Sequence, residues 1–395
     1  MLRLSRIERT RGDFVKFQVN RDVFSEAVSF AVKLLPQRTT LPILSGVLIE
    51  ATDDGLTLSS FDYEVSAQTQ ISAEIEEPGT VLVSGRLLAE IASRLPSAPV
   101  KFTTEEGKIS VVCGSAKFTL LSMPVEEYPT LPQVSSTSGT LSAELFADAI
   151  AQVAVAASRD DVTPVITGVQ LEVSQSSLSL VATDRYRVAV REIEWDAADG
   201  TADTVNALVP ARTLSEIGKT FGHGGTVSIS ITNTDERELI AFSAEKKTVT
   251  SLLIKGNFPP VKRLFPESVD NYAVINTTEL IEAVRRVSLV LEREAALRFT
   301  FSIDGLTLEA IGSEQAQASE TIDAFLTGSD TVVSLKPAFL LDGLSSVHSE
   351  FVRVSFTKTE NPNKPGPVLI TSQSSKDQPG ADNYKYLLQP NLLLR

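Results

Sequence analysis

Apolar side chains recur every three or four positions in six segments of the chain. This spacing gathers them on one helical face, so each segment is predicted to form an amphipathic helix that packs on a core. The predicted helices span residues 21–35, 84–95, 142–157, 210–221, 277–293 and 336–348.

The predicted helices belong to a pattern that occurs three times along the chain. A Leu-x-Leu segment follows the first helix of each copy and begins at Leu56, Leu178 and Leu306, so successive copies are 122 and 128 residues apart. Alternating apolar residues such as Ile109 and Val111 follow the second helix and predict strands. This period is too long for a solenoid repeat, so each copy is expected to bury its own core.

Clusters of Pro, Ser, Thr and Gly separate the copies at residues 129–139 and 259–266, which is typical of linkers between compact units. The predicted fold class is therefore α+β, with three similar domains in tandem. The domains are predicted at residues 15–133, 138–260 and 264–395.

The first fourteen residues are rich in arginine but have no apolar core and no cleavage site of a secretory signal. We interpret residues 1–14 as a disordered extension. A translation start upstream of the natural one would also explain them.

Charge and cysteine content narrow the class of protein further. The formal net charge is −14 and the pI is near 4.8, which argues against tight binding of nucleic acid, because such binding needs a positive excess. The single cysteine cannot form an internal disulfide, and no apolar run approaches the roughly 20 residues that a membrane-spanning helix needs. A cytoplasmic protein is expected.

The sequence offers little for catalysis. His223 lies in a Gly-rich turn and His348 near the end of a predicted helix, while Cys113 is in the apolar phase of a strand and is predicted to be a buried structural thiol. Asp160 and Asp161 are adjacent in a polar loop, where carboxylates usually face solvent. No phosphate-binding loop, dinucleotide turn, zinc helix or nucleophile elbow motif occurs. We therefore predict no catalytic residue, no metal site and no cofactor.

One segment of the second copy resembles a known family. Residues 182–189, Ala-Thr-Asp-Arg-Tyr-Arg-Val-Ala, are similar to the A-T-D-x-[H/Y]-R-[L/M] signature of bacterial DNA sliding clamps, the beta subunit of DNA polymerase III. Further similar segments are Leu-Pro-Ile-Leu at 41–44, Gly-Asn-Phe-Pro at 256–259 with Lys-Arg-Leu at 262–264, and Tyr-Leu-Leu-Gln-Pro at 386–390.

The resemblance implies a non-enzymatic processivity factor. Two protomers would form a head-to-tail homodimer, a six-domain ring with helices lining the hole and antiparallel sheets outside, which encircles duplex DNA of any sequence. The six predicted helices carry ten Lys and Arg against ten Asp and Glu, and the rest of the chain carries 26 against 40. An acidic exterior around a neutral lining would let DNA slide, since few phosphate contacts mean weak retention by affinity.

The resemblance also assigns residues to DNA. By position in the family pattern, four arginines are candidates to face the phosphates, and solvated surface charge explains them equally well. These candidates are Arg38, Arg86, Arg94 and Arg212.

A peptide-binding pocket between the second and third domains is implied as well. It would receive short apolar motifs from the DNA polymerase III catalytic subunit, the clamp loader, translesion polymerases, ligase and mismatch-repair proteins. The residues that match the family's pocket are Ile166, Thr183, Arg185, Tyr186, Arg187, Val188, Pro259, Leu264, Leu387 and Gln389. A peptide that buries two or three apolar side chains gains about 1.5–3 kcal/mol from each, before the entropic cost of ordering the peptide is subtracted. This predicts roughly micromolar affinity.

For ring closure, the resemblance points to Phe118 and Leu120 of one protomer against Ser288 and Leu289 of the other. Buried strand positions explain Phe118 and Leu120 equally well. At the C-terminus this chain departs from the family pattern, with Gln389 where Met is frequent and Leu392 where Arg is frequent.

Two other hypotheses stay open at this point. The altered C-terminal segment would suit a specialised or resistance-type clamp paralogue. Scattered Asp, Ser and His residues leave room for a hydrolase with an unrecognised site, although no motif supports it.

Overall fold

The computed structural model describes residues 14–392 except 36–38, 133, 135–137, 199–204, 234–237, 293, 311–315, 359–364 and 381–382. Residues 1–13 of the predicted extension, and Arg38 among the predicted DNA-facing arginines, lie outside the described residues.

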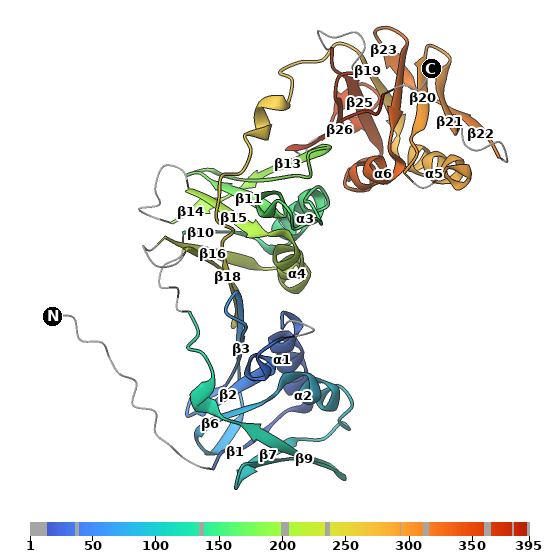
Figure 1. Ribbon diagram of the computed structural model, residues 1–395. Helices are drawn as coiled ribbons and strands as arrows, with labels where there is room; N and C mark the ends of the chain where they lie inside the picture. Colours follow the sequence, from blue (N-terminus) through green and yellow to red (C-terminus); the bar gives the residue numbers. More distant parts are fainter. Residues whose placement is uncertain are drawn as a thin grey trace. The chain divides into compact units, whose positions relative to one another are not determined.

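The element order repeats three times, which confirms the threefold pattern read from the sequence (Figure 1). Each repeat runs from a short strand into a helix, through a group of strands to a second helix, and then through further strands.

The first repeat comprises β1 (Lys16–Val19), α1 (Arg21–Lys33), η1 (Pro42–Ser45), β2 (Gly46–Thr52), β3 (Gly55–Phe61), β4 (Val65–Ile71), β5 (Glu74–Glu77), β6 (Gly79–Ser84), α2 (Gly85–Ala92), β7 (Val100–Glu105), β8 (Lys108–Cys113), β9 (Ala116–Met123) and η2 (Val125–Glu127). The second comprises β10 (Gly139–Ser142), α3 (Ala143–Ala154), η3 (Pro164–Ile166), β11 (Gly168–Val173), β12 (Ser177–Thr183), β13 (Arg187–Glu194), β14 (Asp196–Ala197), β15 (Val205–Pro210), α4 (Ala211–Phe221), β16 (Thr226–Asn233), β17 (Glu238–Ala244), β18 (Lys247–Leu252) and η4 (Val261–Leu264). The third comprises β19 (Tyr272–Asn276), α5 (Thr277–Val287), η5 (Ser288–Val290), β20 (Leu297–Ser302), β21 (Gly305–Ala310), β22 (Ala318–Ile322), β23 (Phe325–Thr327), β24 (Thr331–Leu335), α6 (Pro337–Ser345), β25 (Phe351–Phe356), β26 (Val368–Ser375), β27 (Gln378–Pro379) and β28 (Asn383–Leu388).

The first helix of each repeat begins at a polar cap. The side chains of Asn20, Ser142 and Asn276 each accept a hydrogen bond from a backbone N–H in the first turn of α1, α3 and α5. Such caps satisfy N–H groups that have no partner within the helix. The helices end earlier than predicted, most clearly α5, which stops at Val287 where Ser288 donates to the Val284 carbonyl and a 3-10 turn follows.

The described chain divides into two compact units, and each is treated by itself. Unit 1 comprises the chain up to Thr140 together with Gly225–Leu252, and unit 2 comprises Leu141–Gly224 together with Leu253–Arg395. Strands β16 to β18 of the second repeat belong to unit 1 because β18 pairs antiparallel with β4.

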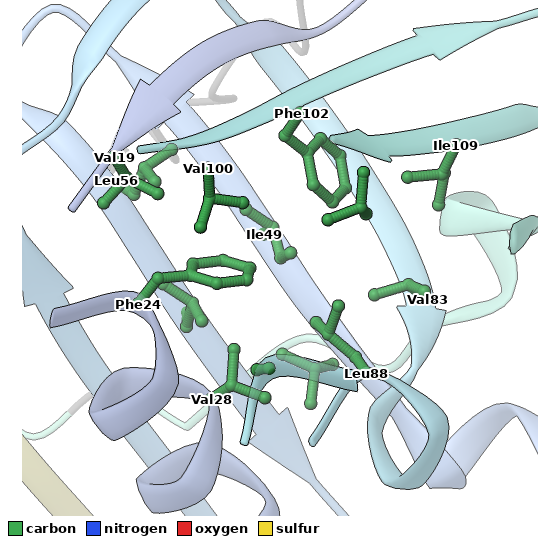
Figure 2. Packing of buried hydrophobic residues seen from close by; sticks show 14 of the residues in the cluster. Val19, Phe24, Val28, Ile49, Leu56, Val83, Leu88, Val100, Phe102 and Ile109 are labelled. Atoms are coloured by element: carbon green, nitrogen blue, oxygen red, sulfur yellow. The ribbon is translucent and has the colours of Figure 1, made fainter. Parts of the chain in front are cut away.

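The core of the first repeat lies between its two helices and its sheet. Figure 2 shows Phe24 and Val28 of α1 and Leu88 of α2 pointing toward Ile49 and Phe102 of the strands. The rings of Phe17 and Phe102 stack, with their centroids 4.6 Å apart. The apolar face predicted for each of these helices is the buried one, as hydrophobic burial requires.

Unit 2 holds two antiparallel sheets. One has the strand order β15-β11-β12-β13-β28-β26-β25-β19-β23, and the other the order β22-β21-β20-β24. In the first of these, β13 of the second repeat pairs with β28 of the third, with Val188 opposite Leu387. This pairing joins two repeats across one continuous sheet.

A buried tyrosine belongs to a second apolar cluster in unit 1. Tyr128 packs with Leu48, Phe61 and Leu82, and its hydroxyl accepts from the Phe61 N–H at 2.8 Å and donates to the Gly46 carbonyl at 3.3 Å. Burial raises the pKa of Tyr128 to about 12. The phenol is therefore held in its neutral form by the fold.

We expect Tyr128→Phe to lower the free energy of unfolding at neutral pH by about 1–2 kcal/mol, because a buried N–H loses its acceptor. Since the folded pKa of Tyr128 lies above the unfolded value near 10, its contribution is complete below pH 10 and is lost as pH rises toward 12. Urea unfolding at pH 8 and at pH 11.5, for wild type and variant, measures this. A stability difference that does not shrink at the higher pH contradicts the prediction.

Candidate functional site

The signature segment of the second repeat forms the turn between β12 and β13. Asp184 organises it, because one carboxylate oxygen accepts from the backbone N–H groups of Tyr186 at 3.1 Å and Arg187 at 3.2 Å. Arg185 has a left-handed backbone with φ of 80°, a strained conformation for a residue with a side chain. Its guanidinium donates to the Thr163 hydroxyl just before η3. The turn is thus held on both sides.

Arg187 is the centre of a buried network that joins the second and third repeats. Its guanidinium is 2.8 Å from Asp184 and 2.6 Å from Asp342 of α6, and it donates to the Tyr386 hydroxyl at 3.1 Å. Its central carbon lies 4.4 Å from the centre of the Phe339 ring. Burial alone would lower the pKa of Arg187, but the Tyr386 hydroxyl, Asp342 and Asp184 raise it above its ordinary value.

Tyr386 completes the network from the third repeat. Its hydroxyl donates to the Phe339 carbonyl at 2.7 Å, and burial raises its pKa. Gly343 of α6 lies against the Tyr386 ring, where a Cβ atom would come within 2.6 Å. Helix α6 therefore packs closely on β28, and this contact brings Phe339 and Asp342 to Arg187.

Beside this network lies an apolar cluster with exposed members. Val181, Val188, Val190 and Leu387 are buried together, and Phe258, Val261, Phe265 and Leu369 pack on them partly exposed. Tyr186 is exposed and stacks on Phe339, with ring centroids 6.0 Å apart, and Leu264 at the end of η4 is exposed as well. Apolar side chains left open to solvent beside a packed cluster are typical of partner-binding surfaces.

The predicted pocket residues fall into two groups. Arg185, Tyr186, Pro259, Leu264 and Gln389 are exposed or partly exposed, whereas Ile166, Thr183, Arg187, Val188 and Leu387 are buried. The Thr183 hydroxyl donates a hydrogen bond to the Arg187 carbonyl, and the Gln389 backbone N–H donates to the Tyr186 carbonyl. Of these residues, Val188 and Leu387 belong to the apolar cluster, and Tyr186 stacks on Phe339. Phe339 and Asp342 were missed, because nothing in the sequence links α6 to the signature segment.

Two of the arginines predicted to face DNA occupy equivalent places. Arg86 and Arg212 are the second residues of α2 and α4, and both are exposed. Arg94 is exposed just after the end of α2. Their side chains reach solvent, as a phosphate contact requires.

The residues predicted for ring closure lie in two places. On β9 the alternation turns Leu120 into the core and leaves Phe118 partly buried against it, while Leu121 on the other face is 74% exposed. Leu289 in η5 is 83% exposed, and Ser288 is partly buried. Leu121, which the sequence reading left out, is the more open side chain of β9.

Two strands of the described structure, β9 and β22, also have an edge that is not fully paired. Over residues 116–121, β9 pairs with β8, and its pairing with β6 involves only Ser122 and Met123. Strand β22 has β21 as its one neighbour in the described part of its sheet. Unpaired strand edges offer backbone groups to another chain.

The residues considered for chemistry have structural surroundings. Cys113 is buried, with its sulfur 3.2 Å from the Pro96 and Ala98 carbonyl oxygens, as predicted for a structural thiol. His223 lies in a turn in which Gly224 and Gly225 have positive φ, and His348 lies beyond the end of α6. Asp160 caps its own loop by accepting from the Val162 N–H. Among the described residues, no group of three His, Cys, Asp or Glu side chains is placed to hold a metal ion.

No helix within the described ranges is long and apolar enough to cross a membrane.

Comparison with known proteins covers most of the chain. Models of the DNA polymerase III beta subunit match at residues 15–132 for its N-terminal domain, 140–260 for its central domain and 262–377 for its C-terminal domain. The Beta sliding clamp of Streptomyces coelicolor is 45% identical over 377 residues, which is 95% of this chain and 99% of that protein. The Beta sliding clamp homolog GriR of Streptomyces muensis is 39% identical over 376 residues, with the same coverage of both chains.

Solved structures agree with this result. The DNA polymerase sliding clamp of Bacillus subtilis superposes with a TM-score of 0.87 at 28% identity and covers 96% of this chain and 100% of that one. A Pseudomonas aeruginosa sliding clamp bound to griselimycin superposes with a TM-score of 0.84 at 26% identity, with the same coverage. Three family domains in order, a threefold element repeat and these superpositions show that the chain belongs to the beta sliding clamps, the beta subunit family of DNA polymerase III.

Proposed function

We propose that two copies of this chain close head to tail into a cytoplasmic ring that encircles duplex DNA and tethers the replicative polymerase to it. The family is a processivity factor with no catalytic activity of its own, which removes the hydrolase hypothesis. The threefold repeat carries this proposal, because six similar domains from two chains can close a ring.

The two strand edges support head-to-tail closure. The open edge of β9, with Leu121, and the open edge of β22, whose Glu320 pairs with Arg286 three residues before Leu289, are different surfaces of one chain. A contact between two different surfaces is heterologous, and it closes in a dimer when each protomer supplies both. The less exposed Phe118, Leu120 and Ser288 would pack behind the side chains that make this contact.

Charge supports sliding. The chain is acidic overall, so the ring would hold DNA by enclosing it while Arg86, Arg94 and Arg212, with Arg38, make sparse phosphate contacts. Such contacts position the duplex and read no sequence.

Retention on loaded DNA tests the proposal. The ring, placed on a nicked circular plasmid by a clamp loader, is expected to stay bound at a salt concentration that removes unloaded protein. Cutting the plasmid once should release it within minutes, because a ring slides off a free end. Equal retention on circular and linear DNA overturns the proposal.

We further propose that the surface around Tyr186 and Leu264 receives short apolar motifs. The candidate partners are the polymerase catalytic subunit, the clamp loader, translesion polymerases, ligase and mismatch-repair proteins. The exposed apolar side chains beside the buried Val188 and Leu387 support this, since a peptide that covers them removes apolar surface from water.

Leu264→Ser is expected to weaken binding of an apolar motif peptide about tenfold, since losing one buried leucine contact costs about 1.5 kcal/mol. The exposed Leu41 of unit 1 provides the matched control, because Leu41→Ser removes a side chain of the same size and similar exposure. Fluorescence anisotropy with a labelled peptide measures both. Equal weakening by the two variants would place the site elsewhere.

A specialised or resistance-type paralogue is the second candidate function. Gln389 and Leu392 in the C-terminal segment motivate it, and the chain is also 39% identical to GriR, which is named as a homolog of the beta sliding clamp. The higher identity to the Streptomyces coelicolor clamp supports the replicative role. Full stimulation of processive synthesis by the replicative polymerase would count against the paralogue.

A further inference from the structure

The turn before β4 in unit 1 is built like the signature turn before β13. Tyr63 has φ of 76° where Arg185 has 80°. One carboxylate oxygen of Asp62 accepts hydrogen bonds from the backbone N–H groups two and three residues later, those of Glu64 at 2.9 Å and Val65 at 2.7 Å. Asp184 accepts from the same two relative positions in its own turn. The two turns are structural equivalents in different repeats.

The strand pairing beyond each turn is equivalent too. Strand β18 pairs with β4 so that Thr250 lies opposite Ser66, and the Leu252 N–H donates to the Glu64 carbonyl. In unit 2, Leu387 lies opposite Val188, and the Gln389 N–H donates to the Tyr186 carbonyl. The junction of the first and second repeats therefore has the construction of the proposed peptide site.

The side chains on the two equivalent sheet surfaces have different chemistry. The register matches Val188, Val190, Leu369 and Leu387 of unit 2 with Ser66, Gln68, Ala241 and Thr250 of unit 1. Each bulky apolar residue has a small or polar counterpart. The equivalent surface in unit 1 consequently has a polar floor and more free space.

A cavity of about 150 Å³ occupies that space. Its lining includes Ser66, Gln68 and Thr250 of the sheet, and Leu131 and Val134 of the chain after η2. Ser66 and Thr250 are 5% and 4% exposed, and within the described residues neither hydroxyl has a hydrogen-bond partner. A hydroxyl group can both donate and accept a hydrogen bond, so these two are available to a group bound in the cavity.

We propose that this cavity is a second partner-binding site, which takes one uncharged hydrogen-bonding side chain, such as threonine or asparagine, from a short segment of a partner protein. Its volume is similar to that of an engineered cavity which holds one benzene molecule, so it suits a single side chain. The nature of the occupant rests on the proposed peptide function of the equivalent surface, whereas the cavity stands on its own geometry.

The lining excludes other classes of side chain. A purely aliphatic group would leave the hydroxyls of Ser66 and Thr250 and the Gln68 amide without partners. A carboxylate or ammonium group would lose its hydration with no opposite charge among the lining residues. Threonine or asparagine offers hydrogen bonds to the floor and carbon surface to Leu131 and Val134.

Saturation-transfer NMR on the full-length chain tests the site with capped pentapeptides Gly-Ala-X-Ala-Gly, in which X is Thr, Asn, Leu or Asp. The Thr and Asn peptides are expected to bind with Kd of about 1 mM or tighter, and the Leu and Asp peptides at least tenfold more weakly at this site. The double variant S66A/T250V should weaken the Thr and Asn peptides about tenfold. Thr250→Val is nearly isosteric, so the fold is retained.

Three outcomes overturn the inference. One is a wild-type chain that binds the Thr and Asn peptides no better than S66A/T250V does. Another is equal binding of free glycerol and the peptides, which would make the site one for small polyols. The third is a crystal structure, soaked with the Thr peptide, that shows only ordered water in the cavity.

An apolar motif peptide, measured in parallel, separates this inference from the proposed function. Its binding is expected to be unchanged in S66A/T250V. If it fails to bind wild type while the Thr peptide binds, the proposed peptide surface in unit 2 is wrong and the second site stands. If the apolar peptide binds wild type while the Thr peptide does not, the second site is wrong and the proposed peptide surface in unit 2 stands.

Discussion

Replacing Arg187 with methionine is expected to lower the free energy of unfolding of unit 2 by about 3 kcal/mol, because it breaks a buried ion-pair network by removing one partner. The Arg187 side chain is 7% exposed, and its guanidinium contacts Asp184, Asp342, the Tyr386 hydroxyl and the Phe339 ring together. Methionine fills similar volume but leaves the Asp184 carboxylate buried without its cation. Asp342 is 42% exposed and can regain water, which places the expected loss at the lower end of the range for such pairs.

The single tryptophan of the chain is a convenient probe for this measurement. Trp195 is buried just after β13 in unit 2, so its fluorescence during urea unfolding reports on that unit. Arg185→Met is the matched control, because Arg185 is two residues away and exposed, and it loses only one exposed hydrogen bond, to the Thr163 hydroxyl, so its loss should cost no more than about 1 kcal/mol. Equal losses in the two variants would show that the network does not stabilise the junction.

Lysine at the same position separates charge from geometry. Arg187→Lys keeps the positive charge but cannot donate in a fixed fork to two carboxylates and a hydroxyl at once. We expect a loss of stability between those of the methionine variant and the control. A lysine variant as stable as wild type would mean that charge alone holds α6 to β13.

The second large effect is expected at the proposed ring interface. Leu289→Asp should raise the dimer dissociation constant by about a thousandfold or more, since each lost leucine contact costs about 2 kcal/mol and a head-to-tail dimer contains two copies of the interface. Leu289 is 83% exposed, so the substitution should leave the folded protomer intact. Sedimentation velocity across a concentration series measures the change, and circular dichroism checks the fold.

Ile303 is the control for this experiment. It lies in the turn between β20 and β21 of the same repeat and is 81% exposed, so Ile303→Asp makes the same kind of change at a comparable surface position. Its dimer should dissociate as wild type does. An unchanged dissociation constant for Leu289→Asp, or an equal change for both variants, contradicts the assignment of Leu289 to the interface.

Much of the fold follows from periodicity alone. The spacing of apolar residues around Phe24 and Leu88 predicts α1 and α2, and the recurrence of Leu56, Leu178 and Leu306 predicts three copies. Helix α4 ends at Phe221 as predicted, but the other five helices end earlier than predicted, because helix ends depend on local hydrogen bonds such as that of Ser288, which spacing does not reveal. The resemblance assigned Phe118 and Leu120 of β9 to ring closure and left out the more exposed Leu121, because spacing alone does not show which apolar side chain of a strand meets solvent.

The sequence by itself determined the local features of this protein: the helices, the alternating strands, the threefold order and the signature turn at Asp184. These depend on neighbouring residues, whose contacts follow from chain geometry. Only the tertiary structure decided that Arg187 pairs with Asp342 and Tyr386, residues 155 and 199 positions away, and that Ser66 and Thr250 occupy the places of Val188 and Leu387. Such contacts arise from strand pairing between repeats, and many residue pairs in the chain would satisfy the same local pattern.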